Sequence, residues 1–97
     1  MREELYRSID AGGTTTITLE ATGDGGLQLF YHDIGEEARR SFGDSDYEAW
    51  ATVPAVEVPK LAFALLAERW RGDPRALSAF RDFCRERAIA AESGSWT

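Results

Sequence analysis

Apolar and polar residues alternate along the first half of the chain, which predicts a sheet. The alternation is clearest over residues 14–21, where apolar residues at every second position alternate with threonines and a glutamate. A period of two is typical of a strand with one buried face, and branched threonines favour that conformation. Weaker alternation predicts three more strands, at residues 4–10, 27–33 and 47–53. Turns rich in glycine connect the first three strands as a meander.

The second half of the chain changes to the helical period. Residues 55–70 are apolar around most of the helical circumference and leave only one narrow charged stripe. A helix of this kind has to be covered on two sides. Pro59 is tolerated only in the first turn, so the helix begins near Ala55 or Val56, and Gly72 ends it.

A second amphipathic helix and a tail complete the chain. Asp73 as the N-cap, with Pro74 at the first helical position, predicts the start of this helix, and its apolar arc ends near Ala88. The tail is either frayed or a short strand that buries Trp96. The sequence therefore predicts a single α+β domain over residues 1–97. It consists of a four-stranded, mainly antiparallel sheet with two C-terminal helices packed on one face.

The net charge of −6 is unevenly distributed. Residues 1–54 hold 4 Arg against 11 acidic residues, whereas residues 55–97 hold 7 basic against 6 acidic residues. An acidic sheet repels phosphate backbones, so the composition disfavours nucleic acid as the partner.

The sequence predicts a cytoplasmic protein. The Met-Arg-Glu-Glu start has no apolar signal region. The apolar run over residues 61–67 is far shorter than the roughly 20 residues that a membrane-spanning helix needs. Cys84 is the single cysteine, which excludes an internal disulfide and a cysteine zinc cluster.

Residues 8–16, Ser-Ile-Asp-Ala-Gly-Gly-Thr-Thr-Thr, resemble the phosphate-binding turn of the sugar kinase, actin and heat-shock ATPase superfamily. In that superfamily a strand, an Asp, a Gly-Gly turn and a Thr bind ATP phosphate within a hairpin. The superfamily also needs a second lobe, a second phosphate loop and an adenosine pocket, for which this chain is too short. A plain hairpin turn is the favoured interpretation, and a phosphate- or nucleotide-binding enzyme that uses Thr14 is an alternative.

The residues that could catalyse a reaction lack partners. His32 is the only histidine, and strand alternation points it away from Asp33. Cys84 lies on the apolar arc of its helix, where a thiol stays protonated. Six acidic residues between 33 and 48 match no calcium loop and indicate a solvated rim. We therefore predict no catalytic residue, no metal site and no cofactor, and we favour a non-enzymatic protein.

The outward face of the predicted sheet carries the candidate binding residues, which are Tyr6, Phe30, His32 and Trp50. Exposed aromatic residues concentrate binding energy in protein interfaces, and they can also stack nucleic-acid bases. A protein interface and an intramolecular cover by the Trp96 tail are equally favoured interpretations. Single-stranded nucleic acid is a distant third, because no Lys or Arg lies among these aromatic residues.

Several stretches resemble those of small bacterial proteins without an assigned activity. These stretches are Gly43-Asp44-Ser45-Asp46-Tyr47-Glu48-Ala49-Trp50, Thr52-Val53-Pro54, Val58-Pro59 and the later Phe80 and Phe83. The resemblance covers most of the chain and implies a β-meander, a Val-Pro helix and a C-terminal helix followed by a tail with a Trp. It implies no activity, because that family has no assigned catalytic or binding residues.

Together these patterns favour a small, acidic, cytoplasmic protein-interaction module. Its partner is another protein or further copies of the same chain, and a toxin-neutralising immunity protein is one form of such a module. The alternatives are single-stranded nucleic-acid binding through the aromatic face and a phosphate- or nucleotide-binding enzyme.

Overall fold

The computed structural model describes residues 1–43 and 46–96. Asp44 and Ser45, which belong to the stretch that carries the bacterial resemblance, lie outside the described residues, as does Thr97. The chain divides into two compact units, one over Met1–Ala62 and one from Phe63 onward.

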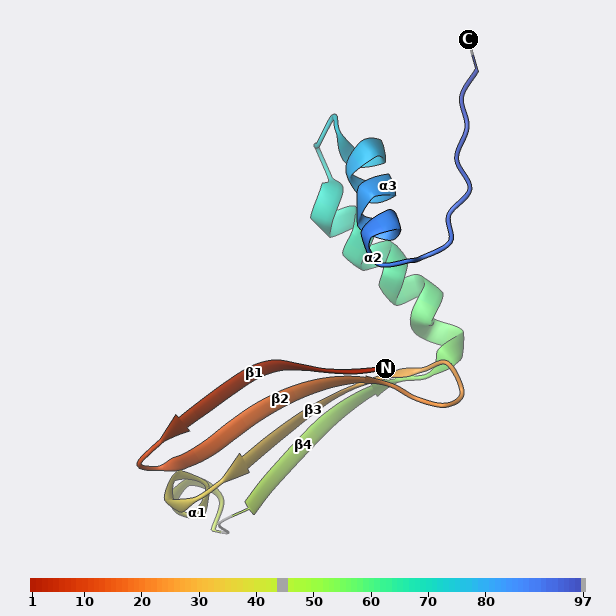
Figure 1. The fold of residues 1–97 in the computed structure, drawn as a ribbon. Helices are drawn as coiled ribbons and strands as arrows, with labels where there is room; N and C mark the ends of the chain where they lie inside the picture. The colour runs from red at the N-terminus through yellow and green to blue at the C-terminus, as the bar shows by residue number, and fades with distance from the viewer. Residues whose placement is uncertain (44–45, 97) are drawn as a thin grey trace. The chain divides into compact units, whose positions relative to one another are not determined.

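The first unit is built on an open antiparallel sheet. Its strands are β1 (Arg2–Asp10), β2 (Gly13–Ala21), β3 (Leu27–Ile34) and β4 (Asp46–Val53). They pair in the order β1-β2-β3-β4, and each pair is antiparallel (Figure 1). The predicted α+β class and the N-terminal meander are confirmed.

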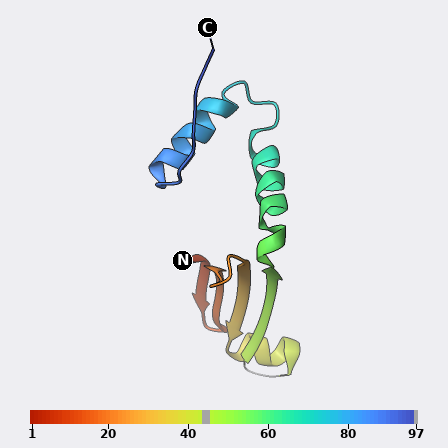
Figure 2. The same cartoon turned by 90° about the vertical axis from the view of Figure 1, so that its right-hand side faces the viewer.

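A short helix, α1 (Glu36–Phe42), connects β3 to β4 and lies at one end of the sheet (Figure 2). It contacts β2, β3 and β4, and its Ala38 is fully buried. Gly43 ends the helix with a left-handed φ of 81°, and its N–H donates to the carbonyl of Arg39. Glycine suits this position because it adopts positive φ without steric cost.

The register assigns each strand residue to one of two faces, because directly paired residues point the same way. The first face, called the apolar face, carries Glu3, Tyr6, Ser8, Thr15, Ile17, Leu19, Ala21, Leu27, Leu29, Tyr31, Asp33, Tyr47, Ala49, Ala51 and Val53. The second, called the Trp50 face, carries Arg2, Glu4, Arg7, Ile9, Thr14, Thr16, Thr18, Glu20, Gln28, Phe30, His32, Ile34, Asp46, Glu48, Trp50 and Thr52. On β2, β3 and β4 these faces are the predicted ones.

A β-bulge at Leu5 makes the prediction wrong for Tyr6. Glu4 pairs with Thr18 and Tyr6 pairs with Ile17, so Leu5 is an extra residue between two regular pairs. An extra residue reverses the alternation of side chains along a strand. Tyr6 therefore lies on the apolar face instead of the face that carries the other three candidate residues.

The helices of the second half form close to their predicted ranges. A 3-10 turn, η1 (Ala55–Glu57), leads into α2 (Val58–Trp70), with Pro59 in its first turn. Gly72 follows its end with a φ of 78°, as predicted. Among the described residues no helix is long and apolar enough to cross a membrane.

The last helix, α3 (Ala76–Glu86), is shorter than predicted at both ends. Arg75 occupies the N-cap, and Asp73 instead closes the preceding turn by accepting the Arg75 N–H at 2.8 Å. At the other end the N–H of Ile89 donates to the carbonyl of Cys84 at 2.8 Å. This reverse turn ends the helix before Ala88, whose φ of 55° is not helical.

Within the second unit α2 and α3 meet through aromatic rings. The Trp70 ring lies edge-on to Phe80 and Phe83, at centroid distances of 5.8 and 6.0 Å. Edge-to-face pairs of this kind add to the stabilisation that comes from burial alone. Cys84 is buried on α3.

The tail over residues 89–96 contains no regular secondary structure, and Trp96 is fully exposed within its unit. The alternative in which the tail forms a short strand is therefore wrong. Four expectations concern the relation between the two units and stay predictions. They are the packing of the helices on one sheet face, the covering of the first helix on two sides, the cover of the aromatic face by the tail and the single domain.

Candidate functional site

The structure brings three of the four predicted binding residues together on the Trp50 face. Phe30 and Trp50 are directly paired on β3 and β4, and His32 is the next residue of β3 on the same face. The Phe30 and His32 rings lie 6.0 Å apart. Trp50 is 64% exposed within its unit. Tyr6 lies on the opposite face and cannot contribute to this surface.

Two carboxylates approach His32 across the pairing of β3 with β4. Glu48 is the direct partner of His32, and Asp46 lies two residues before Glu48 on the same face. Nε2 of His32 lies 2.5 Å from Oδ1 of Asp46 and 3.7 Å from Oε1 of Glu48. We call this group the His32 cluster. Its ligand atoms all lie within 4.8 Å of one another, which makes it a set that could hold a metal ion.

Asp46 and Glu48 were expected only as part of a solvated acidic rim, and Asp33 alone was considered as a partner of His32. The approach of these two carboxylates to His32 was therefore missed. The expectation that His32 and Asp33 point to opposite faces is confirmed by the register. The pairing of Glu48 with His32 follows from the register of β3 against β4. A register can be predicted from the sequence where a tight turn joins two strands, but here helix α1 separates them.

Asp33 is a buried carboxylate with a structural role. It accepts hydrogen bonds from the hydroxyls of Thr15, at 3.1 Å, and Tyr31, at 3.5 Å. A buried carboxylate is costly unless such donors satisfy it. Through these two hydroxyl donors, Asp33 links β2 and β3 near the end of the sheet.

The turn between β1 and β2 has the predicted strand–turn–strand geometry. Oδ1 of Asp10 accepts the N–H of Gly12 at 2.8 Å, so this carboxylate acts within the turn. A Cβ atom placed on Gly13 would lie 1.9 Å from the carbonyl oxygen of Ile34. Backbone therefore already occupies the side of Gly13 towards which a Cβ atom would point. The nucleotide-binding alternative stays a prediction.

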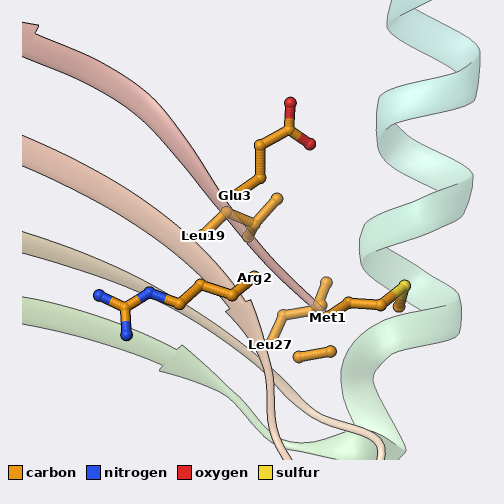
Figure 3. A pocket seen from close by; sticks show the side chains of 6 residues that line it. Met1, Arg2, Glu3, Leu19 and Leu27 are labelled. Carbon is orange, nitrogen blue, oxygen red and sulfur yellow. The ribbon is translucent and has the colours of Figure 1, made fainter.

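A hollow of about 330 Å³ opens at the end of the apolar face away from α1 (Figure 3). Its lining residues are Met1, Arg2, Glu3, Leu19, Ala21 and Leu27. In Figure 3 the Arg2 guanidinium and the Glu3 carboxylate point in different directions. Small-molecule sites combine an apolar cavity with convergent polar groups, and this hollow has no such convergence.

The apolar face is also hollowed over its middle, where the small Ala49 and Ala51 lie. The hollow measures about 220 Å³. No apolar side chain assigned to this face is buried within the described part of the first unit, and Leu29 is 44% exposed. A sheet face of this composition is normally covered in a stable protein.

No protein-family model, no curated protein and no solved structure matches the chain. The resemblance to small bacterial proteins therefore stays a prediction.

Proposed function

We propose that the protein is a non-enzymatic, cytoplasmic protein-interaction module whose Trp50 face binds a basic partner protein. The observation that carries this proposal is the exposure of Trp50, 64%, on the edge strand β4 of an ordered sheet, directly opposite Phe30. The free thiol of Cys84 suits a reducing compartment.

Trp50 has the surroundings of an interface hot spot. Backbone pairing with β3 fixes its position, and Phe30 lies directly opposite. Tryptophan residues at the centre of an interface concentrate binding energy when a partner removes them from water. Covering roughly 150 Å² of an aromatic side chain stabilises a complex by about 4 kcal/mol, at about 25 cal/mol per Å².

The carboxylates of the Trp50 face specify the charge of the partner. The face carries four carboxylates, those of Glu4, Glu20, Asp46 and Glu48, against two guanidinium groups, those of Arg2 and Arg7. Residues 1–54 carry 4 Arg against 11 acidic residues. This arrangement complements a basic protein surface and repels both nucleic acid and a second copy of the same face. A basic protein toxin that the chain neutralises is one partner with this chemistry.

The test uses three tag-free forms of the chain as bait: wild type, Trp50→Ala and Trp96→Ala. Both tryptophans are exposed, but only Trp50 lies on the sheet, so the tail variant is a matched control. We expect a basic protein from a lysate of the source organism to be retained by the wild type and by Trp96→Ala, and lost with Trp50→Ala. With the purified partner, Trp50→Ala should raise Kd about 30-fold, which corresponds to about 2 kcal/mol.

Equal retention by wild type and Trp50→Ala would overturn the proposed surface. A partner with a strongly acidic surface would overturn the electrostatic argument. If no protein is retained by any form, the proposed function itself fails.

A further inference from the structure

We propose that the His32 cluster binds a divalent first-row transition-metal ion of the Zn²⁺ type. The ligands are Nε2 of His32, a carboxylate oxygen of Asp46 and a carboxylate oxygen of Glu48. The site does not depend on the proposed protein partner.

The distances within the His32 cluster fit a metal ion after a small adjustment. Zn²⁺ binds nitrogen and oxygen at about 2.0–2.2 Å, so neighbouring ligand atoms of a tetrahedral site lie roughly 3.3–3.5 Å apart. Here Nε2 of His32 lies 2.5 Å from Asp46 and 3.7 Å from Glu48, and the whole set spans 4.8 Å. Shifts of about 1 Å per ligand atom bring all three into the range that Zn²⁺ accepts.

The backbone holds the three ligands in place before any ion arrives. His32 and Glu48 are directly opposite on β3 and β4, and Asp46 lies on the same face two residues from Glu48. Ligands that project from strands need less ordering than ligands on loops. The adjustment is therefore confined to side-chain rotations.

The donor set selects the class of ion. One imidazole and two carboxylates suit first-row divalent ions, for which nitrogen and oxygen donors are typical. Calcium needs six to eight oxygen ligands, more than this group offers. The two carboxylates balance the charge of the ion.

The solvent side of the His32 cluster stays open. The side chain of His32 is 27% exposed, and those of Asp46 and Glu48 are about half exposed. Three protein ligands leave a fourth position for water, as in zinc sites that keep an open coordination position. The ion can enter and leave without movement of the backbone.

The single histidine of the chain gives this proposal a direct readout. In ¹⁵N NMR of the tag-free, full-length wild type, addition of ZnCl₂ should shift the Nε2 resonance of His32 and saturate at one ion per chain. A competition titration against a colorimetric zinc chelator then compares variants. His32→Ala and Glu48→Gln should each weaken Zn²⁺ binding at least tenfold. The matched control is Glu20→Gln, which removes an exposed carboxylate of the same face outside the cluster and should leave Zn²⁺ affinity unchanged.

An unshifted Nε2 resonance, no saturable binding below about 1 mM Zn²⁺, or equal affinity of wild type and His32→Ala would overturn the site. The NMR measurement uses the wild type, so it decides the question even where a variant fails to fold. The partner-binding test contains no added metal, so either proposal can fail without the other.

Discussion

Gly13 and Gly35 allow two turns of the first unit to meet backbone against backbone. A Cβ on Gly13 would lie 1.9 Å from the Ile34 carbonyl oxygen, and one on Gly35 would lie 2.5 Å from the Gly12 carbonyl oxygen. Both glycines have positive φ, 135° and 132°, which residues with a side chain rarely adopt. The contact joins the β1–β2 turn to the start of α1.

Gly13→Ala should therefore lower the free energy of unfolding by about 3 kcal/mol or more, because backbone strain of about 1–3 kcal/mol adds to a collision with backbone. Gly43→Ala separates the two causes, since its φ of 81° is strained but nothing lies within 4 Å of the new Cβ. Gly43→Ala should lower the free energy of unfolding by about 1 kcal/mol. Gly23→Ala, which meets neither a positive φ nor a collision, should lower it by about 0.5 kcal/mol or less. Urea unfolding followed by circular dichroism measures all three. Equal losses for Gly13→Ala and Gly43→Ala would contradict the backbone contact.

Asp24, in the turn between β2 and β3, has a pKa that is shifted by its hydrogen bonds. A hydrogen bond from the Thr22 hydroxyl, and after it one from the Gly26 N–H, lowers the pKa of Asp24 below its ordinary value. Because the pKa is lower in the folded state, the ionised carboxylate stabilises the turn above the unfolded pKa of about 3.9. That contribution is lost as the pH falls through the folded pKa.

Thr22→Val removes the largest cause and should raise the pKa of Asp24 towards its ordinary value. The carboxyl ¹³C shift of Asp24, followed from pH 7 to strong acid, measures this directly. Thr52→Val removes a hydroxyl from β4 that bonds Gln28, so it is a control that should leave the pKa of Asp24 unchanged. An unchanged pKa in Thr22→Val would assign the shift to the Gly26 N–H instead.

At the scale of elements, the bulge in β1 determines which side chains share a face. Strand residues three positions apart normally point to opposite faces. With Leu5 as the extra residue, Glu4 and Arg7 share the Trp50 face, and Nη2 of Arg7 lies 2.7 Å from Oε1 of Glu4. The hydrogen bond from Arg7 holds the pKa of Glu4 below its ordinary value. The bulge thus allows Glu4 and Arg7 to form an ion pair, because in a regular strand the two side chains would point to opposite faces.

Deletion of Leu5 should convert β1 into a regular strand without moving the residues on either side of it. Tyr6 should stay opposite Ile17, and the stability should change by no more than about 1 kcal/mol. Cross-strand NOEs of Glu4 with Thr18 and of Tyr6 with Ile17 measure the register, with Leu5→Ala as the control that keeps the chain length. Both pairs should be present in the wild type, in Leu5→Ala and in the deletion. If β1 has no bulge in solution, the wild type and Leu5→Ala will show only one of the two pairs, because a regular strand cannot hold both.

The elements also show which parts of the structure the sequence could predict. The faces of β2, β3 and β4 follow from strong alternation between glycine-rich turns, and Pro59 and Gly72 mark the ends of the first long helix. The bulge was not predictable from residues 4–10, because an edge strand has only one partner to enforce its alternation. The His32 cluster needed a register that α1 conceals. Local signals therefore predicted the elements, whereas the candidate site depends on pairing between distant residues.

For the whole molecule, the excess of negative charge and the proposed aromatic anchor lie in the same part of the chain. Acidic residues outnumber arginines 11 to 4 over residues 1–54, whereas the remainder is nearly balanced. The exposed Trp50 lies within the acidic part. Long-range attraction accelerates association with a basic partner, and the contact with an aromatic anchor slows dissociation. The two contributions can therefore be separated kinetically.

Association with the proposed partner should slow as salt is added, because screening shortens the range of the attraction to about 8 Å at physiological ionic strength. The double variant Glu20→Gln, Glu48→Gln should lower the association rate several-fold and change the dissociation rate little. Trp50→Ala should do the reverse, with dissociation about 30-fold faster and association changed by less than about threefold. Glu92→Gln removes a carboxylate from the tail and serves as the charge control. Stopped-flow traces over a series of salt concentrations measure both rates. A salt-independent association rate, or a slower association with Glu92→Gln equal to that of the double variant, would show that the carboxylates of the Trp50 face do not steer the partner.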